Sequence, residues 1–323
     1  MSGPHILVVR LGAMGDIIHA LPAVASLKNS FPGARITWVV EPRWAPLLEG
    51  NPFVDRVTPL RRATARGILA SWREIRSERY DFAVDFQGLI KSAVTAACAR
   101  PERIFGFHRS QAREGAAALF YSDEVRSASE HVVDRNVDLA AAAGATAALR
   151  VFPLPPGAPE GELPPGGFVL ASPLAGWRRK QWPLAYYGAL AARLRSEMGM
   201  ALVLNGPESA AGELAEVGGV GRQSSGLAGL IHATRRAAAV VGVDSGPMHL
   251  AAALGRPGVA IFGPTDPARN GPYGGSMRVL RSPSAATTYK RSEEIDPSMR
   301  EISADEVFES LRDALSGAAE RRP

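Results

Sequence analysis

The chain has 323 residues, of which 46% are hydrophobic and 21% charged, and it contains one cysteine, Cys98. This balance is that of a globular protein and excludes wholesale disorder, while the single cysteine excludes a disulfide framework and a cysteine-rich metal site. No apolar run reaches the roughly 18–20 residues of a membrane-spanning helix. The start lacks a basic leader, which favours a cytoplasmic protein. The net charge of +5 comes from 33 arginines and four lysines, as expected of a GC-rich genome or of anion recognition.

The first half of the chain alternates apolar strands with helices. Strands are expected at residues 5–10, 36–40, 82–86 and 103–106, and helices at residues 17–28, 44–48, 66–79, 91–99 and 131–143. Strands that alternate with helices form a parallel sheet covered on both faces, so this half predicts a doubly wound α/β domain.

A segment rich in proline and glycine then interrupts the pattern. Residues 151–167 contain six prolines and four glycines, a density typical of a linker. The alternation resumes with strands at 168–172, 201–205, 239–243 and 258–262, and helices at 184–198, 247–254 and 304–318. We therefore expect an N-terminal domain over 1–152, a linker over 153–167, a C-terminal domain over 168–303, and a C-terminal helix and tail over 304–323. Two such Rossmann-like domains would face each other across a cleft, with ligands at the carboxyl ends of the strands.

The first candidate site follows the first strand, in the sequence Arg10-Leu11-Gly12-Ala13-Met14-Gly15-Asp16. The two glycines permit a sharp turn, and Asp16 then stands at the start of a helix. Asp16 has two interpretations, an N-cap of that helix or a catalytic carboxylate facing the cleft. The motif lacks the third glycine of the dinucleotide fingerprint, and Glu41 is a poor candidate for a ribose contact, which argues against a nicotinamide cofactor.

The second candidate site is the sequence Gly242-Val243-Asp244-Ser245-Gly246-Pro247-Met248-His249. A strand ends here, and Pro247 stands where the first turn of a helix begins. The free N–H groups and the dipole of such a helix start attract an anion, and Gly246 beside Ser245 leaves room for a phosphate to touch the backbone. We favour this anion site over a plain connecting loop, although His249 alone could be a core histidine.

Smaller candidates stand in the same domain. Three cations at residues 178–180 follow a strand end between two tryptophans, and they are either a solvated charge run or the other side of a diphosphate clamp. Glu208 could accept hydrogen bonds from ribose hydroxyls, and Thr265 could contact a sugar. For each of these two an ordinary loop role is an equal alternative.

The arginines gather in the N-terminal domain. Residues 56–79 hold seven arginines against two glutamates, a net charge equal to that of the whole chain. We weigh a solvated helix face evenly against a surface for an anionic acceptor or an anionic lipid. Nucleic acid is disfavoured as a partner, because no recognition motif is present and few aromatic residues stand among these arginines.

Together these segments resemble the ADP-heptose lipopolysaccharide heptosyltransferase family over nearly the whole chain. The further matching sequences are His19-Ala20-Leu21-Pro22-Ala23, Asp85-Phe86-Gln87-Gly88-Leu89-Ile90-Lys91-Ser92, His131-Val132-Val133-Asp134-Arg135 and Phe262-Gly263-Pro264-Thr265-Asp266-Pro267. The resemblance implies the GT-B arrangement and an inverting transfer without a metal or other cofactor. It also implies a nucleotide sugar in the C-terminal domain and an acceptor on the N-terminal one. Some first-heptose enzymes have a hydroxyl pair where this chain has Ala175 and Gly176, which leaves open which heptose is added.

The resemblance, with the patterns above, assigns roles by position. Asp16 matches the family's base. The candidate donor-binding residues are Lys180, Glu208, Asp244, Ser245, Gly246, His249 and Thr265. The candidate acceptor-binding residues are Arg10, Arg61, Arg62, Arg66, Gln87 and Arg135.

The chemistry agrees with these roles. Inverting transfer is one in-line displacement at the anomeric carbon, which needs a base for the acceptor hydroxyl and positive potential on the leaving diphosphate. We therefore expect a cytoplasmic enzyme, on or near the inner face of the inner membrane, that moves heptose from ADP-heptose to an anionic glycolipid of the lipopolysaccharide inner core, Kdo-lipid A or heptosyl-Kdo. The alternatives are a protein acceptor, a nucleotide-sugar epimerase or hydrolase of the same fold, and a non-catalytic protein that binds a nucleotide sugar or a glycan.

Overall fold

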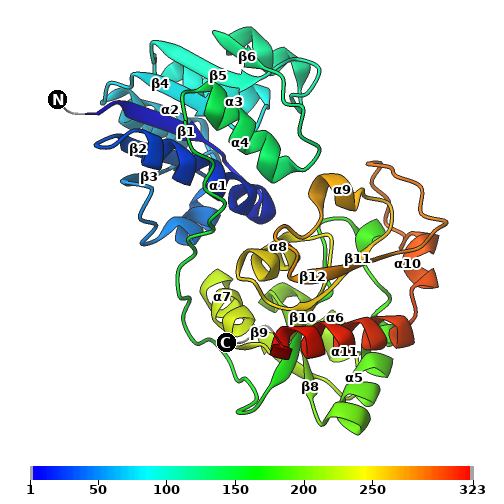
Figure 1. The fold of residues 1–323 in the computed structure, drawn as a ribbon. Coiled ribbons are helices and arrows are strands. Elements are labelled where there is room, and N and C mark those ends of the chain that lie inside the picture. The colour runs from blue at the N-terminus through cyan, green and yellow to red at the C-terminus, as the bar shows by residue number, and fades with distance from the viewer. Residues whose placement is uncertain (1–2, 321–323) are drawn as a thin grey trace. The chain divides into compact units, whose positions relative to one another are not determined.

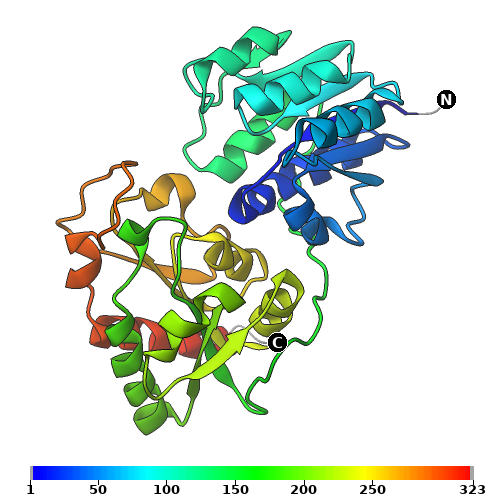
Figure 2. The ribbon, with the colours of Figure 1, turned by 180° about the vertical axis from the view of Figure 1, so that it is seen from behind.

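The structure is a computed structural model that describes residues 3–320, and the chain divides after Pro155 into two compact units. Each unit is built on a six-stranded sheet in which every pair of neighbouring strands is parallel, with helices packed on the sheet (Figures 1 and 2). The prediction of an α/β protein with two doubly wound parallel sheets is confirmed.

The first sheet has the strand order β3-β2-β1-β4-β5-β6. Its strands are β1 (His5–Val9), β2 (Arg35–Val40), β3 (Arg56–Pro59), β4 (Phe82–Asp85), β5 (Arg103–Phe107) and β6 (Asp123–Val125). The α-helices of this unit are α1 (Met14–Ser30), α2 (Ala65–Arg76), α3 (Ile90–Cys98) and α4 (Val132–Ala142), and the 3₁₀ segments are η1 (Pro42–Leu48) and η2 (Gly115–Phe120). Helix α1 packs against α4, and α3 packs against α2 and η2.

The second sheet has the strand order β12-β11-β10-β7-β8-β9. Its strands are β7 (Phe168–Ser172), β8 (Ala201–Gly206), β9 (Gly221–Ser224), β10 (Ala239–Val243), β11 (Gly258–Phe262) and β12 (Met277–Arg281). The α-helices are α5 (Leu184–Met198), α6 (Ala211–Ala215), α7 (Leu227–Arg236), α8 (Gly246–Ala253), α9 (Pro267–Asn270), α10 (Pro297–Glu301) and α11 (Ala304–Glu320), with 3₁₀ segments η3 (Arg178–Lys180) and η4 (Glu208–Ala210).

The two sheets share one topology, because β7 to β12 repeat the positions of β1 to β6. In each sheet the chain runs from an inner strand to one edge and then returns to the other side of that first strand. The order reverses between β1 and β4 in the first unit and between β7 and β10 in the second. Loops that leave the carboxyl ends of the strands at such a reversal are where doubly wound sheets bind ligands.

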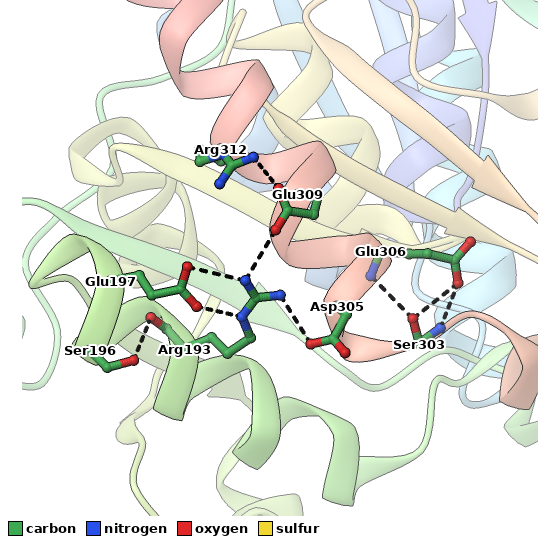
Figure 3. Close-up of polar contacts among 8 residues, drawn as sticks. All are labelled: Arg193, Ser196, Glu197, Ser303, Asp305, Glu306, Glu309 and Arg312. Atoms are coloured by element: carbon green, nitrogen blue, oxygen red, sulfur yellow. Dashed lines mark hydrogen bonds and ion pairs between the residues drawn. The ribbon is translucent and has the colours of Figure 1, made fainter.

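The C-terminal helix is fastened to the second unit through Arg193 on α5. Its guanidinium forms ion pairs with Glu197 at 2.6 Å, Asp305 at 3.0 Å and Glu309 at 3.1 Å, as Figure 3 shows. The same group lies 4.0 Å from the ring centroid of Phe308, a fully buried side chain of α11. The exposed ion pairs contribute little one by one, but the network aligns α11 with α5 over the buried ring.

The structure departs from the expected elements at the sheet edges and at helix ends. The four edge strands β3, β6, β9 and β12 were not predicted, nor were α6, α7, α9 and α10. The predicted linker holds no helix or strand between Ala142 and Phe168, a stretch that is described throughout. The predicted C-terminal helix is α11, and residues 321–323 of the predicted tail lie outside the described residues.

Candidate functional site

The reversal point of the first sheet brings two loops together. Arg10 and Leu11 leave β1, and Phe86 and Gln87 leave the neighbouring strand β4. The Arg10 guanidinium donates a hydrogen bond to the Phe86 carbonyl, and the Leu11 N–H donates to Gln87 Oε1 at 2.7 Å. These bonds connect the two loops, so the loop after β4 fixes the segment that leads to Asp16.

Asp16 lies in the first turn of α1 and is paired with two arginines. Its Oδ1 lies 2.7 Å from Arg10 Nη2 and 2.9 Å from Arg113 Nη2, and its Oδ2 accepts a hydrogen bond from the Ala13 N–H at 3.1 Å. The Asp16 side chain is 18% exposed, whereas Arg10 is buried. Two guanidinium groups therefore hold an ionised carboxylate in one orientation while leaving part of it open to a ligand.

The N-cap interpretation of Asp16 was wrong. Helix α1 begins at Met14, three residues before the expected start, and Ala13 is its N-cap. Asp16 is the third residue of the helix and bonds back to the N-cap N–H, as the acidic residue of a capping box does. This bond fixes the carboxylate, which is compatible with the catalytic interpretation.

Glycine is required at Gly12 by the packing of the loop. A Cβ at this position would lie 2.8 Å from the indole nitrogen of Trp44 in η1, closer than real Cβ contacts allow. The Trp44 ring is therefore seated directly against the backbone that precedes Asp16. Gly12 permits this close approach, and the contact helps to fix the turn after β1.

The other predicted acceptor-binding residues are spread over this unit. Arg62 forms an ion pair with Glu41 at 2.6 Å, and Arg61 lies 3.7 Å from Glu74. Arg66 is exposed in the first turn of α2. Arg135 on α4 places its guanidinium 5.6 Å from the ring centroid of Phe107. Gln87, in contrast, is buried and holds the Leu11 backbone.

The reversal point of the second sheet brings together three of the predicted donor-binding residues. Asp244 follows β10, Lys180 stands in η3 after β7, and His249 lies in the first turn of α8. Lys180 Nζ lies 3.0 Å from Asp244 Oδ2, and His249 Nε2 lies 3.6 Å from Asp244 Oδ1. The carboxylate thus orients one ammonium and one imidazole at the carboxyl edge of the sheet.

The environment of Asp244 keeps it ionised. Burial on its own would raise its pKa, but the hydrogen bond with His249 and the positive charge of Lys180 outweigh burial and hold the pKa of Asp244 well below its usual range. Asp244 is therefore an anion at physiological pH, and it holds the side chains of Lys180 and His249 in place.

Two hydroxyl groups near this cluster have no partner among the described residues. Ser245 is the N-cap of α8, yet its Oγ makes no capping bond and is buried without a hydrogen-bond partner. Thr265, which follows the neighbouring strand β11, is 2% exposed, and its Oγ1 is buried and unpaired as well. A buried hydroxyl normally has a partner. Ser245 stands at the start of α8 and Thr265 in the loop after the neighbouring strand, and both hydroxyls fit the oxygens of an anionic ligand.

The three cations at residues 178–180 do not act together. Arg178 lies 3.4 Å from Glu213 and Arg179 lies 2.7 Å from Asp296, so only Lys180 is paired with Asp244. The ring of Trp177 lies 5.0 Å from Lys180 Nζ. The prediction of a three-cation clamp therefore reduces to one lysine beside an aromatic ring.

Two further residues complete the description of the predicted site. Glu208 is exposed at the start of η4, after β8, and Gly246 is the first residue of α8. The sequence interpretation counted Arg113 only among the arginines of the basic surface and did not predict its contact with Asp16. Arg113 lies in the loop after β5 and pairs with that carboxylate. The strand order would have indicated it, since β5 neighbours β4 and its carboxyl end lies at the same edge of the sheet.

Neither a metal cluster nor a membrane-spanning helix is found in the described part of the chain. Within residues 3–320, no group of three or more His, Cys, Asp or Glu side chains could hold a metal ion. None of the helices described there is long and apolar enough to cross a bilayer.

Comparison with known proteins gives a consistent relationship. Residues 68–298 match the family "Glycosyltransferase family 9 (heptosyltransferase)". Lipopolysaccharide heptosyltransferase 1 of Pseudomonas aeruginosa is 33% identical over 304 residues, covering 86% of this chain and 84% of that protein. Lipopolysaccharide heptosyltransferase 2 of Salmonella typhimurium is 30% identical over 354 residues, covering 96% of this chain and 98% of that protein.

Solved structures show the same likeness. The E. coli heptosyltransferase WaaC with ADP superposes with a TM-score of 0.77 at 28% identity, covering 96% of this chain and 99% of that one. The same enzyme with ADP-2-deoxy-2-fluoro heptose gives a TM-score of 0.75 at 27% identity, with the same coverage. The expected family resemblance is confirmed.

Proposed function

This chain belongs to glycosyltransferase family 9, the heptosyltransferases, and on that premise we propose that it transfers heptose from ADP-heptose to the inner core of lipopolysaccharide. The acceptor is an anionic glycolipid, Kdo-lipid A or heptosyl-Kdo. Two observations, one in each unit, carry the proposal. The first unit has an oriented, partly exposed carboxylate at its reversal point, and the second unit has a lysine and a helix start at its own.

The donor is assigned to the second unit because that unit offers groups for a diphosphate. Lys180 supplies an ammonium held by Asp244, and the first turn of α8 supplies backbone N–H groups. Ser245 Oγ and Thr265 Oγ1 are buried hydroxyls that lack partners among the described residues and suit phosphate or sugar oxygens. His249 belongs to the same cluster, and Glu208, at the start of η4 after β8, takes the ribose hydroxyls.

The acceptor is assigned to the first unit, where Asp16 is the base. As the acceptor oxygen bonds to the anomeric carbon, Asp16 takes the hydroxyl proton and the bond to the diphosphate breaks, with its electron pair leaving on ADP. This single displacement inverts the anomeric configuration. Arg10 and Arg113 orient the carboxylate, and the exposed arginines Arg61, Arg62 and Arg66, with Arg135, meet the anionic groups of the acceptor.

The leaving diphosphate gains negative charge as the bond breaks, and protein groups stabilise it. Lys180 and the start of α8 provide positive potential at fixed positions, which lowers the barrier without the cost of reorganising solvent. We therefore infer a reaction that needs no metal ion. The enzyme works on the cytoplasmic side, in peripheral contact with the inner membrane where its acceptor is held.

The proposal is tested by an assay of the purified protein with ADP-heptose and a panel of acceptors. Kdo-lipid A, heptosyl-Kdo-lipid A and no acceptor form the three arms, and released ADP and elongated lipid are both measured. Elongated lipid with ADP released in equal amount supports the proposal. ADP release that is independent of any acceptor would assign the chain to hydrolases, and binding of donor without turnover in any arm would make it a binding protein.

A further inference from the structure

The buried carboxylate of Asp85 has no part in the roles proposed above. Asp85 ends β4, next to the reversal point of the first sheet, and its side chain is fully buried. Its Oδ1 accepts hydrogen bonds from the backbone N–H groups of Gln87 at 2.8 Å and Gly88 at 3.3 Å. Its Oδ2 accepts from Ser92 Oγ at 2.8 Å and from the Tyr121 hydroxyl at 2.7 Å.

This pattern fits an ionised carboxylate. All four partners can donate, so each oxygen of Asp85 accepts two hydrogen bonds. Burial raises the pKa of Asp85 above its usual range, and the bonds from Tyr121, Gln87 and Ser92 offset only part of that rise. Burial of a carboxylate costs free energy even when four donors bind it. This cost indicates that Asp85 has a role beyond packing.

The bonds of Asp85 shape the loop that supports Asp16. By holding the N–H groups of Gln87 and Gly88, Asp85 folds the chain into the turn that follows β4, where Gly88 has a φ of +66°. That turn presents the Phe86 carbonyl to Arg10 and Gln87 Oε1 to the Leu11 N–H. Arg10 in turn pairs with Asp16.

Asp85 is also a counter-charge for Arg10. Arg10 is 2% exposed; burial lowers its pKa, while the negative charges of Asp16 and Asp85 act in the opposite direction. Negative and positive side chains therefore alternate around the loop after β1, in the order Asp85, Arg10, Asp16 and Arg113. Without Asp85, the negative charge of Asp16 would be the only one of these two left to balance the buried guanidinium.

Tyr121 reaches Asp85 because the neighbouring strand makes room for it. Gly106 on β5 has no side chain, and a Cβ there would collide with the ring of Tyr121. Burial and the charge of Asp85 raise the pKa of Tyr121, so its hydroxyl stays protonated and donates to the carboxylate. The cluster is thus built from β4, β5, α3 and the end of η2.

We propose that Asp85 is a positioning residue for the catalytic base, which acts through the Phe86–Gln87 loop and Arg10 to hold Asp16 in its reactive orientation. This inference rests on the proposed function, in which Asp16 is the base. Asp85 makes no contact with substrate in this role. Its effect is on the rate of transfer and not on donor binding, which is assigned to the other unit.

The first test is the variant Asp85→Asn. Asparagine fits the cluster, because its oxygen can accept from the Gln87 and Gly88 N–H groups while its NH₂ donates to Ser92 or Tyr121. The variant removes the charge and keeps the shape. We expect kcat to fall about tenfold to a hundredfold, since small misplacements of a catalytic group have effects of this size, with an unchanged dissociation constant for ADP.

A double-mutant cycle separates positioning from structural damage. In Asp16→Asn the base is absent, so a residue that acts through Asp16 has nothing left to act on. We expect the variant with both substitutions to have the kcat of Asp16→Asn alone. Ile75→Ala removes a buried side chain from the same core and is the stability control, expected to lower Tm and to retain kcat below its unfolding range.

The outcomes are distinct. A kcat of Asp85→Asn within twofold of the wild type, or a double variant that loses the full factor of both substitutions, would overturn the positioning role. Asp16→Asn with wild-type turnover would instead remove the proposed function itself. If Asp85→Asn does not fold, Tyr121→Phe carries the same cycle with one hydrogen bond removed, and its smaller loss of kcat must likewise vanish in the Asp16→Asn background.

Discussion

The two units of this chain have one strand order, but the aspartate at the point where that order reverses is paired differently in each. In the first unit an aspartate, Asp16, is partly exposed and is held by two arginines. In the second unit an aspartate, Asp244, is buried and itself holds a lysine and a histidine. The shared topology therefore places both loops at the carboxyl ends of the strands, whereas the charged groups that are paired there differ between the units.

The two kinds of pairing suit two different chemical roles. A carboxylate that is held and partly exposed can receive a proton, whereas an ammonium that is held beside a helix start can receive a phosphate. The same ion-pair chemistry thus suits the base that we propose in one unit and the anion site that we propose in the other.

Removal of the buried charge in the second unit has the largest expected effect on stability. Asp244→Asn leaves Lys180 and His249 without their counter-ion, and we expect a loss of about 3 kcal/mol near pH 7, as for other broken buried pairs. Because the folded pKa of Asp244 is lowered, its contribution is complete above the unfolded pKa and is lost as pH falls through the folded pKa. The gap in Tm between variant and wild type should stay constant down to about pH 4 and narrow only below it. A gap that narrows between pH 7 and pH 5 would contradict this assignment.

The second-largest expected effect is weaker donor binding after removal of the Lys180 ammonium group. Lys180→Gln should raise the dissociation constant for ADP about tenfold to a hundredfold, the range expected for a charge-assisted hydrogen bond. Arg178→Gln is the matched control, because Arg178 is a neighbouring cation paired with Glu213 instead of Asp244. Calorimetric titration with ADP measures both variants. Equal affinities in the two would take Lys180 out of the donor site.

Substitution of Ser245 has a smaller expected effect, in which ADP affinity falls although the Tm of the ligand-free protein does not. Ser245→Ala removes a buried hydroxyl that has no partner among the described residues, so the ligand-free Tm should hold or rise. ADP affinity should nevertheless fall about twofold to tenfold if that hydroxyl meets the ligand. Ser276→Ala is the control, since Ser276 Oγ is likewise buried and unpaired but precedes β12, at the amino end of the strands. Loss of ADP affinity in both variants would refute the assignment.

The smallest effect concerns a residue outside both reversal points. Arg193→Gln breaks the ion pairs between α5 and α11 shown in Figure 3 and should lower Tm by only a few degrees, on the order expected for a modest loss of stability. Turnover and ADP affinity should both equal those of the wild type when measured at 25 °C. A change in either would mean that α11 takes part in the donor site.

Much of the fold could be predicted because the inner strands are buried on both faces. Strands such as β7, β10 and β11 are continuous apolar runs, and all three were predicted at their observed bounds. The strands that were missed, β3, β6, β9 and β12, are the edges of the two sheets. Sequences such as Asp-Glu-Val in β6 and Gly-Arg-Gln-Ser in β9 are short and polar, as edge strands must be to avoid further pairing.

The site could be predicted where its residues share a motif or, like Lys180, follow the end of a predicted strand. Asp244 and His249 stand in one motif, and the structure places their side chains together. Arg113 is 97 residues from Asp16, and Tyr121 is 36 residues from Asp85, so neither contact is visible without the order of the strands. Local pattern reveals loops and helix starts, whereas the charge balance within a site depends on long-range pairing.

If the two reversal points perform separate tasks, Asp16→Asn removes transfer and leaves ADP binding intact. The variant should lose about a hundredfold to ten-thousandfold in kcat, the contribution of a general base, and should bind ADP with wild-type affinity in the same preparation. Asp123→Asn, which alters another arginine-paired aspartate of the first unit, should leave both quantities unchanged. Turnover by Asp16→Asn within threefold of the wild type, or a matching loss of ADP affinity, would contradict the account.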